Sequence, residues 1–186
     1  GLAAIDHGGS EESALHRSDV SLYAAKSAGR NCLAWFDEKM ELELSTRLKL
    51  EEDIRHGIEA GQFVPFFQPM IDLASKELVG FEALARWRSP TGLLEPESFL
   101  EAAEKTGLIG PLSMSVMEQA LTEARTWPAH LKIAVNVSPI QFRDPNLAAQ
   151  IVKVLAATGF PASRLEIARP RRREVKPLAP ATVEAM

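Results

Sequence analysis

The sequence has little cysteine, no long apolar run and no surplus of positive charge. Its single cysteine, Cys32, excludes an intrachain disulfide and a zinc site built on several thiolates. No run of about 18 apolar residues is present, which excludes an ordinary membrane-spanning helix. Because 21 Lys and Arg stand against 25 Asp and Glu, for a formal net charge of −4, general binding to DNA or RNA polymers is disfavoured.

The N-terminus and the histidines exclude further classes. Residues 1–6 have neither the basic start nor the long apolar stretch of a signal peptide, and with the low cysteine content this indicates a cytoplasmic protein. They also lack an initiator methionine, so we expect the chain to begin inside a larger protein. The four histidines do not have the spacing of a helical zinc-binding motif, and no Gly-rich phosphate loop is present.

The composition that remains is that of a soluble globular protein, with 186 residues that are 46% hydrophobic and 25% charged. The apolar pattern divides the chain into four zones. The first predicts a helix and a short aromatic strand, the second a connector helix, the third alternating strands and helices, and the fourth a basic, proline-rich, disordered tail. These zones are residues 1–40, 41–60, 61–168 and 169–186.

In the first two zones the helices are marked by apolar spacing and by their ends. The pattern predicts a helix over residues 11–28, stopped by Gly29, and then a strand over residues 32–36. A second helix is expected from about Asp37 to Ala60, roughly 36 Å long and with a polar back. Such a helix is typical of a connector between two domains.

The third zone predicts an α/β fold. Two apolar runs, residues 63–71 and 78–87, are separated by a turn short enough for a hairpin, so we expect an antiparallel pair. Strands are expected at residues 131–137 and 164–168, with helices before each. Parallel βα units of this kind fit either an α/β barrel or a doubly wound sheet.

Polar side chains within these strands are the candidates for chemistry. Glu82 lies inside an apolar strand, where an ionised side chain is costly to bury unless it is paired or bound to a metal. Asn136 ends the next strand and Glu166 lies in the one after it. Two carboxylates and an amide would form a hard oxygen site for Mg²⁺. The alternatives are an ion pair between Glu82 and Arg86 within the sheet and an Asn136 that only caps its loop.

The segment FEALARW at residues 81–87 resembles the signature of the EAL family of cyclic-di-GMP phosphodiesterases. Further segments resemble the family's blocks, in family order. They are FQP at 67–69, PESF at 96–99, AEKTGLI at 103–109, VNVS at 135–138 and LEI at 165–167. Residues 18–26 and 29–31 also resemble the end of a GGDEF diguanylate cyclase domain.

This resemblance implies part of a modified TIM (β/α)₈ barrel whose first strand is antiparallel, and hydrolysis of cyclic di-GMP to linear pGpG with Mg²⁺ or Mn²⁺. It implies that Glu82 and Glu166 are catalytic and that they hold the metal together with Asn136. The substrate contacts that it implies are Gln68, Leu84 and Arg86. Family resemblance also implies a homodimer formed through the barrel.

The chain departs from the family pattern near its C-terminal end. The block after the third parallel strand reads Glu166-Ile167-Ala168-Arg169, with a cation where the family has a second glutamate, and the family's later Asp-Asp motif and lysine have no counterpart. A (β/α)₈ barrel takes about 250 residues, and residues 61–168 span less than half of that. We therefore expect a truncated and inactive fragment of a phosphodiesterase. The alternatives are a degenerate module that binds cyclic di-GMP or a protein without catalysis, and an unrelated α/β enzyme in which Glu82 is structural.

Overall fold

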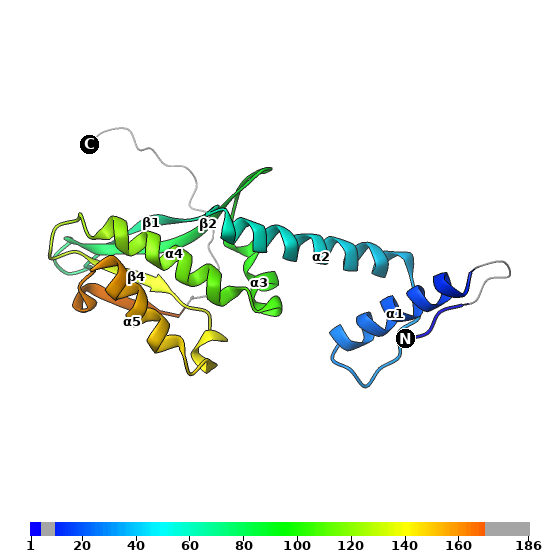
Figure 1. Cartoon of the computed structure of the whole chain (residues 1–186). Helices are drawn as coiled ribbons and strands as arrows, with labels where there is room; N and C mark the ends of the chain where they lie inside the picture. The colour runs from blue at the N-terminus through cyan, green and yellow to red at the C-terminus, as the bar shows by residue number, and fades with distance from the viewer. Residues whose placement is uncertain (5–9, 170–186) are drawn as a thin grey trace.

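The computed structural model describes residues 1–4 and 10–169, which form an α/β layer and a helical arm (Figure 1). Helix α1 (Glu11–Ser27) lies beside the first part of α2 (Glu38–Glu59), and α2 then runs to the sheet. Side chains cap both helices: Ser10 accepts a hydrogen bond from the Ser13 amide, and Asp37 accepts one from the Lys39 amide. The helix predicted from about Asp37 to Ala60 is confirmed to within a residue at each end.

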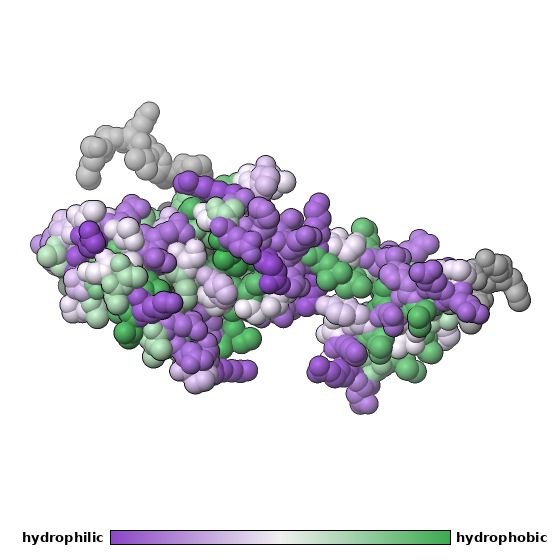
Figure 2. All heavy atoms as spheres, in the orientation of Figure 1, coloured by the Kyte–Doolittle hydropathy of each residue, from purple (hydrophilic) through white to green (hydrophobic). Residues whose placement is uncertain are grey.

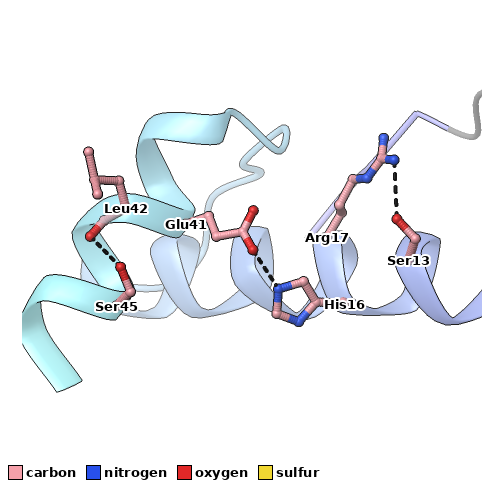
Figure 3. A network of polar contacts seen from close by, with 6 residues as sticks. All are labelled: Ser13, His16, Arg17, Glu41, Leu42 and Ser45. Atoms are coloured by element: carbon pink, nitrogen blue, oxygen red, sulfur yellow. Dashed lines mark hydrogen bonds and ion pairs between the residues drawn. The ribbon is translucent and has the colours of Figure 1, made fainter. Parts of the chain in front are cut away.

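The two helices of the arm are held together by a few polar and aromatic contacts. His16 Nε2 lies 3.0 Å from Glu41 Oε1, which links α1 to α2 (Figure 3). The guanidinium of Arg47 lies 5.5 Å from the ring centre of Tyr23. Large apolar side chains remain exposed on this arm, among them Leu15, Trp35 and Leu42, and Figure 2 shows apolar patches there between polar ones.

The strand predicted over residues 32–36 is wrong. This segment makes one isolated bridge, between Leu2 and Trp35, and its Cys32 is exposed. A strand needs a partner over several residues, and in the described part of the chain only Leu2 supplies one. Apolar composition alone therefore overstated the regular structure of this segment.

The sheet of the described chain has five strands in the order β1-β2-β4-β5, with β3 paired to β2. The predicted hairpin is confirmed, because β1 and β2 pair antiparallel, whereas β2, β4 and β5 are parallel. The strand bounds are β1 (Phe63–Ile71), β2 (Leu78–Ser89), β3 (Gly92–Leu94), β4 (Lys132–Asn136) and β5 (Leu165–Ala168). Pro65 and Pro69 lie in β1, and this matches its place at the edge of the sheet, where missing amide donors cost no ladder bond.

The hairpin turn is closed by the carboxylate of Asp72. Its Oδ1 accepts hydrogen bonds from the backbone amides of Ala74 and Ser75 and from the Ser75 hydroxyl. These bonds stabilise the ionised form and lower the pKa of Asp72, the Ser75 amide contributing most. The turn thereby fixes the register of β1 on β2.

Helices cover one face of the sheet (Figure 1). They are α3 (Leu100–Thr106), α4 (Ile109–Ala124) and α5 (Leu147–Thr158). Against them lie the alternate strand residues Ala83, Ile133 and Val135, packed with Met117 and Leu121 of α4. Burying the valine, isoleucine, leucine and methionine side chains among them stabilises the fold by about 1.5–3 kcal/mol each. The helical face therefore contains the core, and the polar residues of the same strands point to the other side.

A second core cluster joins the connector helix to the sheet. Ile54 of α2 is fully buried beside Phe63, whose ring stacks on Trp87 with 5.0 Å between ring centres. The indole nitrogen of Trp87 donates to Gln62 Oε1 at 3.0 Å. The C-terminal part of α2 thus belongs to the α/β layer.

Among the described residues, none of the helices combines the length and the apolar character that a membrane crossing requires. The tail predicted from residue 169 falls outside the described residues after Arg169.

Candidate functional site

The strand register places the predicted site residues on one face of the sheet. Gln68 pairs with Glu82, Glu82 lies beside Ala134, and Ala134 lies beside Glu166, so one row crosses four strands. Paired residues share a face, and residues two apart on a strand share it too. The site residues on this face, opposite the helices, are Gln68, Glu82, Leu84, Arg86, Asn136 and Glu166.

Two of these residues are in direct contact. Asn136 Nδ2 donates to Glu82 Oε1 at 2.7 Å and joins the carboxyl half of β4 to the middle of β2. Both side chains are half-buried. The Asn136 side chain therefore contacts the carboxylate of Glu82 and does not cap its own loop. Glu82 pairs with this amide and not with Arg86, which was the alternative expected from the sequence.

Glu166 points elsewhere. Its Oε1 lies 2.8 Å from Lys132 Nζ, with half of each side chain exposed, and the pair borders a hollow that is also lined by Met70 and His130. The row places Glu166 two strands from Glu82, roughly 10 Å at the usual strand spacing. In residues 1–4 and 10–169, no three His, Cys, Asp or Glu side chains gather closely enough to hold a metal ion.

The donor set nevertheless fits a hard divalent cation in part. Glu82 and Asn136 offer carboxylate and amide oxygens at one point of the sheet, and Mg²⁺ and Mn²⁺ prefer such ligands. Glu166 lies on the same face, but its carboxylate would have to leave Lys132 to join them. The structure thus brings two of the three predicted ligands together.

Arg86 is held firmly on the same face, four residues along β2 from Glu82. Its Nε lies 2.9 Å from Glu95 Oε2, its Nη1 donates to the Ala85 carbonyl at 2.9 Å, and its guanidinium lies 5.6 Å from the ring centre of Phe66. Leu84 is half-buried and Gln68 is exposed on the same face. The face that carries the Glu82–Asn136 contact therefore also presents a fixed cation, an apolar side chain and an amide.

A buried polar network supports the loop that follows Asn136, and sequence reasoning gave these residues no role. Gln141 Oε1 accepts from the Ser138 amide at 3.1 Å and from Ser113 Oγ at 3.0 Å. The hydroxyl of Ser138 donates to Glu104 of α3. Since Ser113, Ser138 and Gln141 are all buried, this network fixes the end of β4 to α3 and α4. The only sequence signal was that Glu104 and Ser138 lie in two of the family-like blocks.

Comparison with known proteins identifies the family of this arrangement. The EAL domain family model matches residues 51–178. The chain is 39% identical over 163 residues to an uncharacterized signaling protein of Caulobacter vibrioides, covering 87% of this chain and 20% of that protein. It is 35% identical over 153 residues to the bifunctional diguanylate cyclase/cyclic di-GMP phosphodiesterase MucR of Pseudomonas aeruginosa, covering 80% of this chain and 22% of MucR.

A solved structure agrees with this assignment. The MucR phosphodiesterase in complex with c-di-GMP superimposes with a TM-score of 0.61 at 35% identity, over 64% of this chain and 50% of that chain. The chain spans about a fifth of the length of the first curated relatives that it matches. The fold and the family are therefore shared over the α/β layer.

Proposed function

The chain belongs to the EAL domain family, and from this premise we propose that it supplies part of the active site of a metal-dependent cyclic-di-GMP phosphodiesterase. The contact between Glu82 and Asn136 is the observation on which the proposal depends, because it joins a carboxylate and an amide from adjacent strands on the face that is free of helices. Similarity to a phosphodiesterase solved with c-di-GMP supports the choice of substrate.

The predicted metal ligands are Glu82, Asn136 and Glu166. Bound there, Mg²⁺ or Mn²⁺ would lower the pKa of a coordinated water and neutralise charge on the phosphate oxygens. Lys132 holds the Glu166 carboxylate in the present arrangement, so the third ligand becomes available only when that ion pair opens. Glu82 needs no such movement.

The substrate contacts that we propose are Gln68, Leu84 and Arg86. Arg86 would donate hydrogen bonds to a phosphate oxygen, since a guanidinium matches the geometry of that anion. Leu84 offers an apolar surface beside it, and Gln68 offers both a donor and an acceptor for the edge of a guanine base. All three lie on the same face as the metal ligands.

For the organisation of the chain, we propose a GGDEF remnant over residues 1–40, a connector helix over 41–60 and the first half of an EAL (β/α)₈ barrel over 61–168. The exposed apolar side chains of the arm support the first part, since such a surface is typical of a unit that packs on further protein. MucR, a matched relative, is described as both diguanylate cyclase and phosphodiesterase. A cytoplasmic location and a homodimer formed through the barrel complete this proposal.

We further propose that the chain by itself has little or no hydrolytic activity. The site face of the described sheet leaves Phe66 exposed, and only two of the predicted metal ligands meet on it. The second candidate function, binding of cyclic di-GMP without hydrolysis, is favoured by the firmly held Arg86, because phosphate binding needs no third metal ligand.

Calorimetric titration of the chain with cyclic di-GMP and Mg²⁺, followed by chromatography for pGpG, tests these proposals. Binding without pGpG supports the receptor, and pGpG formation would contradict the proposed inactivity. Absence of both would leave no function for this chain alone. In a longer EAL protein carrying these residues, Glu82→Gln should abolish hydrolysis, whereas unchanged hydrolysis would show that Glu82 is structural.

A further inference from the structure

Arg86, the proposed phosphate ligand, already has an anionic partner in the fold. Leu94, the last residue of β3, pairs with Trp87 of β2, so the following residue, Glu95, comes beside Arg86. The Glu95 Oε2 atom lies 2.9 Å from Arg86 Nε. Neither side chain belongs to the Glu82–Asn136 contact, and Glu95 is absent from the predicted site.

The two partners differ in their freedom to move. The Arg86 side chain is 16% exposed, and its Nη1 donates to the Ala85 carbonyl at 2.9 Å. Glu95 is 63% exposed and follows a strand of only three residues. Arg86 is therefore fixed by its surroundings, whereas the Glu95 carboxylate lies mostly in solvent and can turn away when another anion pairs with the guanidinium.

The geometry also divides the donors of Arg86. The Glu95 carboxylate forms an ion pair at Nε, Nη1 donates to the Ala85 carbonyl, and Nη2 is the guanidinium nitrogen that neither contact involves. A phosphate oxygen at Nη2 would stand next to the Glu95 carboxylate, and two anions on one cation repel each other. Glu95 thus neutralises the charge that would attract a phosphate.

We infer that Glu95 is an internal competitor that weakens the binding of a phosphodiester anion to Arg86 and so sets the affinity of this subsite. The inference rests on the proposed function in one respect, namely that Arg86 contacts the phosphate of a cyclic dinucleotide. It goes beyond that function by naming a residue on the β3 side of the sheet that sets the affinity of the subsite. Glu95 acts through Arg86 and needs no contact with the substrate.

The test is a titration of the 186-residue chain with cyclic di-GMP and Mg²⁺ at low ionic strength. Binding is monitored through the ¹⁵N resonances of the arginine Nε groups. Glu95→Gln keeps an oxygen acceptor for Arg86 Nε but removes the charge, so it should tighten binding about three- to tenfold. The matched control is Glu97→Gln, which removes the same charge from an exposed residue two positions further along, and it should change the affinity less than twofold.

The same exchange is repeated in an Arg86→Gln background, where the gain from Glu95→Gln should disappear. Equal or weaker binding by Glu95→Gln contradicts the inference, as does an equal gain in the absence of Arg86. If neither the parent chain nor any variant binds, the proposed function fails and the inference fails with it. If the parent binds and Glu95 has no effect, the inference alone fails.

Discussion

Replacing Gln141 by Met should destabilise the protein strongly, because one side-chain oxygen serves two buried donors. Gln141 Oε1 accepts from the Ser138 amide and from Ser113 Oγ, at 3.1 and 3.0 Å. Met has nearly the same length and volume as Gln but no strong acceptor, so the exchange removes the hydrogen bonds without opening a large cavity.

The size of the effect follows from the burial of the two donors. A buried donor left without a partner costs about 1–3 kcal/mol. The Ser113 hydroxyl can rotate toward another acceptor but the Ser138 amide cannot, so we expect a total loss of about 2–4 kcal/mol. With a urea m-value of about 2 kcal/mol/M, the midpoint of unfolding should fall by about 1–2 M.

Urea unfolding followed by circular dichroism measures this loss, and an unchanged m-value shows that the two unfolding transitions are comparable. Gln150→Met is the matched control, since the Gln150 side chain donates to Asp144 Oδ2 in an exposed contact at 3.2 Å. The control should change stability by less than about 0.5 kcal/mol. If Gln141→Met costs no more than this control, the network does not stabilise the loop after Asn136.

Three further predictions concern the scaffold. Gly107 ends α3 with φ +77°, so Gly107→Ala should lower the free energy of unfolding by about 1 kcal/mol in the same urea assay. Gly110→Ala is the control and should be neutral or stabilising, because a Cβ there meets no heavy atom within 4 Å. The folded-state pKa of Asp72 is lowered, so its ionised form stabilises the fold above the unfolded pKa of about 3.9. The greater stability of the parent chain over Asp72→Asn should therefore vanish as pH falls through the folded pKa. A stability difference that persists in acid would contradict this. Arg164 donates to three backbone carbonyls at 2.7, 3.2 and 3.3 Å, so Arg164→Lys should lose about 1–3 kcal/mol, and an unchanged midpoint would refute the role of the planar guanidinium.

Sequence reasoning predicted the elements whose signals are local. Two apolar runs joined by a short turn were enough to predict the β1–β2 hairpin, and the repeated βα spacing was enough to predict parallel pairing of the later strands. The strand β3 was missed because it has only three residues, which the tight turn before Gly92 lets pair with β2.

For the candidate site, the sequence predicted which residues share a face of the sheet but not which side chains contact one another. Strand alternation put Glu82 and Arg86 on one face, but the partners of their side chains lie far along the chain or on another element. Asn136 is 54 residues from Glu82, and Lys132 is 34 residues from Glu166, so no local pattern encodes these contacts. Long-range register decided which polar groups meet.

The central claim is that the oxygen ligands of Glu82 and Asn136 hold a divalent cation, and titration of the isotope-labelled chain with Mn²⁺ tests it most directly. We predict saturable paramagnetic broadening centred on the resonances of these two residues, abolished by Glu82→Gln and retained in Glu77→Gln, an exposed residue that directly precedes β2. Broadening spread evenly over exposed carboxylates, or unaffected by Glu82→Gln, would contradict the claim.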